Sequence, residues 1–307
     1  ACNIAANSDT ILISPGTYRG NLSLDKNLVI ASLYLTSNDT AYLDSTILQG
    51  QGDGCVVEIF GGISPTFSGL TITNGRQDSG GGFRIRNNSS PSILSCKIFG
   101  NSGGIYCTEG SNAIIADCRI YDNHSEIGGE GIRFRDCPRP QIIRTHISNN
   151  SGAGISCQGN SDAQIVDCII EQNQKKGINL SNSSPTIQNC FINGNAGEIV
   201  GGIGFLEGSN AVVINCSITG NRGEATGGIA CYNSSPQISE TIISGNFGGS
   251  VGGVKCAFNA TPVFNNCIIN ENISTGIWGA ILCYECSPLF NYCTIRGNIS
   301  SEGCAGI

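Results

Sequence analysis

Apolar residues recur along this chain in a pattern that repeats every 22 to 27 residues. Ten times an Ile stands two residues after the same slot, from Leu70 and Ile72 to Cys293 and Ile295. Within one repeat, Gly202–Asn221, apolar residues alternate with small or polar ones in short runs separated by Gly, Ser and Asn. Alternation with period two is typical of strands with one face inward, and the runs are too short for helices of about 10–12 residues. The pattern predicts short strands, three in each turn of a coil.

The slot before the Ile holds mostly Cys, with Thr or Leu in other copies: Leu70, Cys96, Cys118, Thr145, Cys168, Cys190, Cys216, Thr241, Cys267 and Cys293. A second slot, ten or eleven residues earlier, alternates Cys with large apolar residues. Cys therefore behaves as a small buried hydrophobe, and we expect interior thiols stacked from turn to turn. Successive turns are about 4.8 Å apart, and this separation also allows disulfides between neighbouring thiols. The better candidates for bridges lie outside both slots: Cys2, Cys55, Cys137, Cys286 and Cys304.

Three residues beyond the Ile, nine copies carry Asn: Asn101, Asn123, Asn150, Asn173, Asn195, Asn221, Asn246, Asn272 and Asn298. Asn tolerates the left-handed backbone of a sharp corner, and stacked amides can bond each other from turn to turn. We therefore interpret all nine as a structural column rather than as catalytic residues.

Repeats of this length predict a solenoid, because one turn cannot bury its apolar residues alone. The predicted fold class is all-β, a single-stranded parallel β-solenoid of about 11–12 rungs, where a rung is one turn of the coil. We expect one domain over 1–307, with irregular rungs at 1–55, regular repeats at 56–302 and the start of a further rung at 303–307.

The repeats resemble those of the pectate-lyase-like superfamily of right-handed parallel β-helices over essentially the whole chain. The start, Asp9–Tyr18 followed by Asn21–Leu24, is similar to that superfamily's first rung. Gly-Gly-Ile elements such as Gly201-Gly202-Ile203 are similar to repeats of polymorphic outer-membrane proteins, but Cys-x-Ile replaces their usual Phe. The resemblance implies the fold and leaves activity open, since the same solenoid serves lyases, hydrolases, esterases, adhesins and fibres.

The composition limits the kinds of molecule that the chain is expected to bind. Charged residues make up only 13% of the chain and the net charge is −7, so no Lys/Arg run is present to neutralise the phosphates of a nucleic acid. No stretch approaches about 18 apolar residues, so no membrane span is expected in this chain. We expect an extracellular or cell-surface protein that is secreted. Both ends lack a polar cap, and Ile307 stands where a new rung opens. Open strand edges favour either a fragment of a longer protein or end-to-end (head-to-tail) self-association.

One outward cluster could bind an acidic sugar: Arg84, Arg86, Tyr106, Arg133 and Arg135. Arg binds carboxylates through two hydrogen bonds and Tyr can stack on sugar rings, with Glu109, Glu130 and Asp136 nearby. The alternative is a salt-bridged sheet face. Glu198 and Glu224 occupy adjacent rungs as a weaker acidic pair, and neither His124 nor His146 supports a catalytic triad.

Sequons are dense, and the glycosylation candidates are Asn21, Asn38, Asn87, Asn123, Asn179, Asn182, Asn233, Asn259, Asn272 and Asn298. We expect no cofactor and no metal site, with Ca²⁺ left open for a lyase. The preferred function is a non-enzymatic subunit or segment of a fibre or adhesin. The alternatives are a polysaccharide lyase or hydrolase acting on acidic glycans through the Arg cluster, and a glycan-binding module without turnover.

Overall fold

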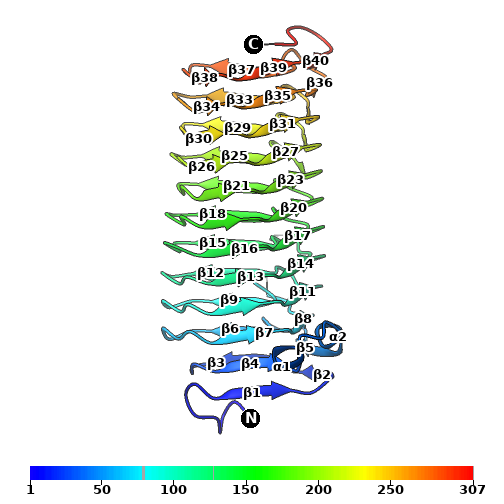
Figure 1. Ribbon diagram of the computed structural model, residues 1–307, viewed down its shortest axis with the longest axis vertical. Helices are drawn as coiled ribbons and strands as arrows, with labels where there is room; N and C mark the ends of the chain where they lie inside the picture. The colour runs from blue at the N-terminus through cyan, green and yellow to red at the C-terminus, as the bar shows by residue number, and fades with distance from the viewer. Residues whose placement is uncertain (78–79, 127, 307) are drawn as a thin grey trace. The chain divides into compact units, whose positions relative to one another are not determined.

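The computed structural model describes residues 1–77, 80–126 and 128–306, and it confirms an all-β parallel solenoid (Figure 1). The chain divides into two compact units, Ala1–Gly152 (unit 1) and Ala153–Ile307 (unit 2). Ile307, which the sequence placed at the start of a further rung, lies outside the described residues. Every strand pair within each unit is parallel, as short strands joined by corners into successive rungs require.

Unit 1 contains three sheets, which we name A, B and C. Sheet A comprises β1 (Thr10–Ile13), β4 (Val29–Ser32), β7 (Thr66–Ser68), β10 (Ser92–Leu94), β13 (Ile114–Ala116) and β16 (Gln141–Ile143). Sheet B comprises β2 (Gly16–Arg19), β5 (Thr46–Gln49), β8 (Thr71–Thr73), β11 (Lys97–Phe99), β14 (Arg119–Tyr121) and β17 (His146–Ser148). Sheet C comprises β3 (Leu22–Leu24), β6 (Val57–Ile59), β9 (Phe83–Ile85), β12 (Ile105–Thr108) and β15 (Ile132–Arg135).

Two short helices interrupt unit 1, α1 (Tyr34–Ser37) and α2 (Ala41–Ser45), which the strand pattern did not predict. They fill the connection between β4 and β5, where the sequence loses its period-two alternation. The Thr71 hydroxyl donates a hydrogen bond to the Leu43 carbonyl at 2.6 Å, and Lys97 forms an ion pair with Asp44. These contacts hold α2 against the outer side of sheet B.

Unit 2 contains three sheets of the same kinds, for which we keep the names A, B and C, and a fourth, sheet D. Sheet A comprises β19 (Gln164–Val166), β22 (Thr186–Gln188), β26 (Val212–Ile214), β30 (Gln237–Ser239), β34 (Val263–Asn265) and β38 (Leu289–Asn291). Sheet B comprises β20 (Ile169–Glu171), β23 (Phe191–Asn193), β27 (Ser217–Thr219), β31 (Ile242–Ser244), β35 (Ile268–Asn270) and β39 (Thr294–Arg296). Sheet C comprises β18 (Ile155–Gln158), β21 (Ile178–Ser181), β25 (Ile203–Leu206), β29 (Ile229–Tyr232), β33 (Val254–Ala257) and β37 (Ile281–Tyr284). Sheet D comprises β24 (Ala196–Gly197), β28 (Arg222–Gly223), β32 (Phe247–Gly248), β36 (Ile273–Ser274) and β40 (Ile299–Ser300).

The apolar core runs up the inside of each unit as columns of like residues. The repeated Ile of sheet B is fully buried in both units, as at Ile98 and Ile218. Bulky Phe side chains fill other inward positions, among them Phe83 and Phe134 of unit 1 and Phe205 of unit 2. Parallel register places each inward residue against its counterpart one rung away, so the sequence period becomes a continuous core.

Each rung turns its corners through residues with left-handed backbone. Such residues precede the Asn column, as at Asp122 (φ 51°) and Gln172 (φ 54°), or are Gly, as at Gly194 (φ 62°). The column Asn residues themselves do not adopt this conformation, which corrects the expectation that they turn the corner. The residue before each column Asn adopts the left-handed backbone instead. Gly, Asn and Asp are frequent at that position because this conformation costs them the least energy.

The Asn column forms a buried ladder in both units. In unit 1, Asn101 Nδ2 donates to Asn123 Oδ1 at 3.0 Å. In unit 2, Asn221 Nδ2 donates to Asn246 Oδ1 at 3.0 Å and to the Ile192 carbonyl at 2.8 Å. The Asn221 carboxamide oxygen in turn accepts the backbone N–H and the side-chain amide of Asn195, each at 3.0 Å. The ladder thereby satisfies buried backbone groups, and the prediction of stacked amides is confirmed.

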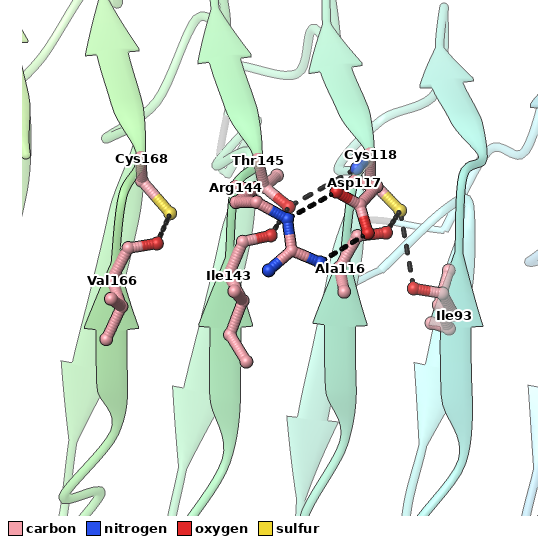
Figure 2. Close-up of polar contacts among 9 residues, drawn as sticks. All are labelled: Ile93, Ala116, Asp117, Cys118, Ile143, Arg144, Thr145, Val166 and Cys168. Atoms are coloured by element: carbon pink, nitrogen blue, oxygen red, sulfur yellow. Dashed lines mark hydrogen bonds and ion pairs between the residues drawn. The ribbon is translucent and has the colours of Figure 1, made fainter.

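The side chains of the Cys slot form hydrogen bonds as well as packing in the core (Figure 2). The Cys118 thiol donates to the carbonyl of Ala116, two residues earlier, at 3.2 Å, and the Thr145 hydroxyl does the same to Ile143 at 3.0 Å. The exchange of Cys with Thr in this slot follows from this shared hydrogen bond. No disulfide joins any of the seventeen cysteines in the described residues, and the five bridge candidates outside the slots are likewise unbridged there.

Gly202 marks a close approach between rungs. A Cβ placed there would lie 2.3 Å from the backbone oxygen of Gly228. The same arrangement recurs in unit 1, where a Cβ on Gly104 would lie 2.3 Å from the Gly131 oxygen. The Gly-Gly-Ile element therefore reflects backbone crowding at the entry to sheet C.

Candidate functional site

The five residues predicted to bind an acidic sugar do lie on one outer surface of unit 1, which we call the arginine face. Register sets Arg84 of β9 opposite Tyr106 of β12, and Tyr106 opposite Arg133 of β15. Their sequence neighbours Phe83, Ile105 and Ile132 are buried, since alternate residues of a strand point to opposite sides of the sheet. Arg86 follows β9 directly, and Arg135 ends β15.

Glu58 organises one end of this face. It stands on β6 opposite Arg84, and its Oε1 lies 3.9 Å from Arg84 Nη1 and 3.0 Å from Arg86 Nε. Two guanidinium groups thus share one carboxylate. The sequence analysis missed Glu58, although it precedes the inward Ile59 as Arg84 precedes Ile85, and the repeat register would have found it.

Tyr106 lies in the middle of the same row. The guanidinium carbon of Arg133 lies 5.8 Å from the Tyr106 ring centroid, and Arg133 Nη1 lies 3.9 Å from Glu130 Oε1. On the opposite side of Tyr106, Arg84 Nε is buried and has no hydrogen-bond partner among the described residues. A buried donor without a partner is costly, and an incoming acceptor would relieve it.

The remaining members of the arginine face add charges of both signs. Arg135 Nε lies 3.9 Å from the Asp136 carboxylate, and Arg86 lies 5.1 Å from the Phe60 ring centroid. Of the nearby acids that the sequence indicated, Glu130 and Asp136 pair with arginines of the face. Glu109 follows β12 directly, one residue beyond Thr108, which lies opposite Arg135. The four arginines of this face are therefore matched by four carboxylates, and the geometry of the guanidinium groups, rather than a net positive charge, is what suits an anionic ligand.

Unit 2 carries a separate titratable cluster around Lys176, which sequence reasoning missed. The methylene groups of Lys176 lie over Gly204 on the outer face of sheet C, and a Cβ on Gly204 would meet its Cδ and Cε at 3.2 Å. Burial lowers the pKa of the Lys176 ammonium, Lys175 lowers it further, and Glu198 opposes the shift. Beside it, Asn179 Oδ1 is buried with no partner among the described residues. The bare Gly204 in an outward row was the signal in the sequence.

The acidic pair Glu198 and Glu224 does come together in unit 2. Both line a shallow hollow with Arg222, and Glu224 N–H donates to the Gly197 carbonyl at 3.3 Å. Within the described residues, no group of three or more His, Cys, Asp or Glu side chains could hold a metal ion.

The structure separates the predicted glycosylation candidates. The side chains of Asn123 and Asn272 are fully buried in the ladder and Asn298 is 8% exposed, so none of the three has room for a glycan. Asn179 is half-buried on β21. The other candidates are exposed: Asn21, Asn38, Asn87, Asn182, Asn233 and Asn259.

Parallel short strands, a stacked Ile core and an internal amide ladder define a right-handed parallel β-helix protein. The chain belongs to the family described as right handed beta helix region, whose model matches residues 31–192 and 181–280. A comparison with curated proteins finds no match. No helix in the described part of the chain is long and apolar enough to cross a membrane.

Solved structures share this fold at low sequence identity. A periplasmic alginate epimerase, AlgG, superposes with a TM-score of 0.73 at 13% identity, covering 94% of this chain and 77% of that one. DFA-IIIase from Arthrobacter chlorophenolicus A6 gives 0.61 at 11% identity, covering 87% and 78%. The catalytic unit of a GH87 alpha-1,3-glucanase from Streptomyces thermodiastaticus strain HF3-3 gives 0.55 at 11% identity, covering 94% and 64%.

Proposed function

We propose that this protein acts on acidic polysaccharides outside the cytoplasm and binds their carboxylates on the arginine face. The observation that carries this proposal is the row Arg84, Tyr106, Arg133 on three adjacent strands, with Arg84 Nε buried and unpartnered. Guanidinium groups match carboxylates in two-point geometry, and a Tyr ring offers a stacking surface for a sugar. The carbohydrate-acting β-helices named above support the proposal by analogy of fold.

The test measures binding of uronic acid oligosaccharides by calorimetry. We expect Arg84→Ala to weaken binding at least about tenfold, the equivalent of about 1.4 kcal/mol. Arg119→Ala is the matched control, because Arg119 is an exposed arginine of sheet B in the same unit. Equal affinity of wild type and Arg84→Ala for these oligosaccharides, or equal loss in the control, would refute the arginine face as the binding site.

A second observation favours turnover over binding alone. Lys176 is half-buried, its pKa is lowered chiefly by desolvation, and a lysine of this kind is suited to accept a proton. In an elimination on a uronate, the amine would take the proton beside the carboxylate, and the C–H electron pair would form the new double bond. The glycosidic oxygen at the neighbouring carbon would leave with its bonding electrons.

This lyase chemistry is read out by the ultraviolet absorbance of an unsaturated sugar product. We expect turnover in the wild type and none in Lys176→Met, with Arg296→Met, at an exposed cation of the same unit, as the control. Binding without any product in the wild type would favour the glycan-binding module instead. If hydrolysis were the reaction, new reducing ends would form without the absorbance change.

The fibre or adhesin hypothesis stays a prediction, and we rank it after action on glycans. It derives from the ends of the sequence, whereas the glycan proposal draws on side chains whose contacts are described. Electron microscopy of the native protein over a range of concentrations tests it. Axial stacks would support it, and short rods at every concentration would contradict it.

A further inference from the structure

A strained aromatic residue stands out at one corner of unit 2. Where sheet C ends, each rung turns through a left-handed residue: Gly159, Asn182, Glu207, Asn233, Phe258 or Glu285. Phe258 is the one aromatic residue among these six; its φ is 59° and it is 51% exposed. A left-handed residue with a Cβ costs about 1–2 kcal/mol, and an exposed ring recovers little by burial. Strain held at a surface is an indication of function.

Two tyrosines flank this residue on the neighbouring rungs. The Phe258 ring centroid lies 6.0 Å from that of Tyr232, which ends β29, and 6.1 Å from that of Tyr284, which ends β37. Tyr284 is 53% exposed. We call these three rings the aromatic corner. Tyr292 also has a left-handed backbone and is 91% exposed, but it has no ring contact among the described residues.

A single ammonium group completes the patch. Lys255 points outward from β33 between Ala230 and Leu282 of the adjacent strands, and its Nζ lies 5.5 Å from the Tyr232 ring centroid. Unit 2 holds only five of the sixteen Lys and Arg residues in the chain, so a cation placed against the rings is a specific feature.

The backbone beneath the rings is fixed from rung to rung. Phe258 N–H donates to the Tyr284 carbonyl at 3.2 Å, and Asn259 N–H donates to the Glu285 carbonyl at 2.7 Å. Asn233 N–H likewise donates to the Ala257 carbonyl at 3.2 Å. Because the corner is held on both sides, the rings require little ordering when a ligand binds.

We propose that the aromatic corner is a subsite for an acidic polysaccharide, with sugar rings stacked on Phe258 and the tyrosines and a uronate carboxylate bound by Lys255. The apolar faces of sugar rings suit exposed aromatic rings, and the ammonium selects an anionic residue of the chain. The ligand class rests on the proposed function, whereas the position and the residues do not, because they lie wholly within unit 2.

The deciding variant is Phe258→Asn in the full chain. Asn occupies the same corner at Asn182 and Asn233, so we expect the melting temperature to hold or rise. Calorimetry with uronic acid oligosaccharides should nevertheless show about tenfold weaker binding. Phe258→Tyr, which keeps a ring, should retain affinity. Tyr292→Asn, the isolated aromatic at a left-handed corner, is the matched control and should change nothing.

Lys255→Met tests the charge separately. We expect it to remove the preference for uronic acid oligomers over neutral oligomers of the same length. Unchanged affinity in Phe258→Asn, with binding lost in Arg84→Ala, would overturn the subsite and leave the proposed function standing. Absence of acidic glycan binding in the wild type would overturn both. A Lys255→Met variant that keeps the wild-type preference for uronic acid oligomers over neutral ones would overturn the role of Lys255 in selecting an anionic sugar.

Discussion

The outward residues of sheet C are mostly charged or aromatic in unit 1 and mostly small or uncharged in unit 2, although the strands pair in the same way in both units. In unit 1 the outward row reads Glu58, Arg84, Tyr106 and Arg133 along adjacent strands. In unit 2 the corresponding row reads Ser156, Asn179, Gly204, Ala230, Lys255 and Leu282. Inward positions barely differ, since both units stack Ile, Phe and Cys. The inward columns and the Asn ladder therefore determine the fold, and the outward row is free to vary with function.

The units also differ in how they turn back into sheet C. Unit 2 adds sheet D, whose two-residue strands precede the Gly-Gly element, as at Arg222–Gly223. In the described part of unit 1 no strand belongs to sheet D, and the helices α1 and α2 lie at a different corner, in one connection from sheet A to sheet B. Eleven of the sixteen Lys and Arg residues lie in residues 1–152. The charged residues thus concentrate in the unit with fewer sheets.

We expect the largest loss of stability from substitutions in the Asn ladder, which each unit contains. Asn221→Ala removes two donated and two accepted hydrogen bonds and takes away the acceptor of the buried Asn195 N–H, whereas Asn246 Oδ1 keeps the backbone N–H of residue 221. We expect a loss of about 4 kcal/mol in the free energy of unfolding, measured by chemical denaturation. Asn123→Ala in unit 1 should cost a similar amount, and the exposed Asn193→Ala very little. A small loss in either ladder variant would break the claim that both units depend on it.

A second test contrasts two glycines of one repeat. Gly202→Ala sets a Cβ against a backbone oxygen at 2.3 Å, so the neighbouring rung must shift. We expect a loss of about 1–3 kcal/mol, as for other overpacked sites. Gly204→Ala meets only the flexible Lys176 side chain at 3.2 Å, and its thermal unfolding should stay close to that of the wild type. Equal losses would show that the outward row is not free to vary.

The smallest effect concerns pH. Because the folded pKa of Lys176 is lowered, its ammonium destabilises the fold by a constant amount at every pH below that folded pKa. This cost disappears as pH rises from the folded pKa to the ordinary value for lysine. Lys176→Met should raise neutral-pH stability slightly and flatten the alkaline part of the curve, as seen in melting temperatures. A variant that follows the wild-type pH curve would contradict the assignment.

The repeat allowed the sequence to predict most of the architecture, because inward residues report their own burial. Ile72 and its counterparts, the inward Cys of the slot and the amide ladder all follow from the repeat period together with the period-two alternation within each repeat. The corner assignment was wrong by one residue, although Gly100 and Gly194 directly before column Asn residues were a visible signal. The helices between β4 and β5 had no such repeat to indicate them.

The candidate site was only partly predictable. Outward positions of the arginine face followed from alternation, and extending the register by one rung would have added Glu58. The reach of Lys176 across Gly204 and the meeting of three aromatic rings depend on side-chain directions, which alternation does not specify. The alternation pattern likewise does not indicate the left-handed backbone of Phe258.

The ladder of unit 2 also has a direction. From Asn195 through Asn221 and Asn246 to Asn272, every side-chain amide donates toward the C-terminal neighbour and accepts from the N-terminal one. Hydrogen bonds aligned in this way polarise one another, so their dipoles add instead of cancelling. The interior of this unit therefore has an electrical polarity, and an Asp in the column, which has no N–H to donate, would interrupt it at a single rung.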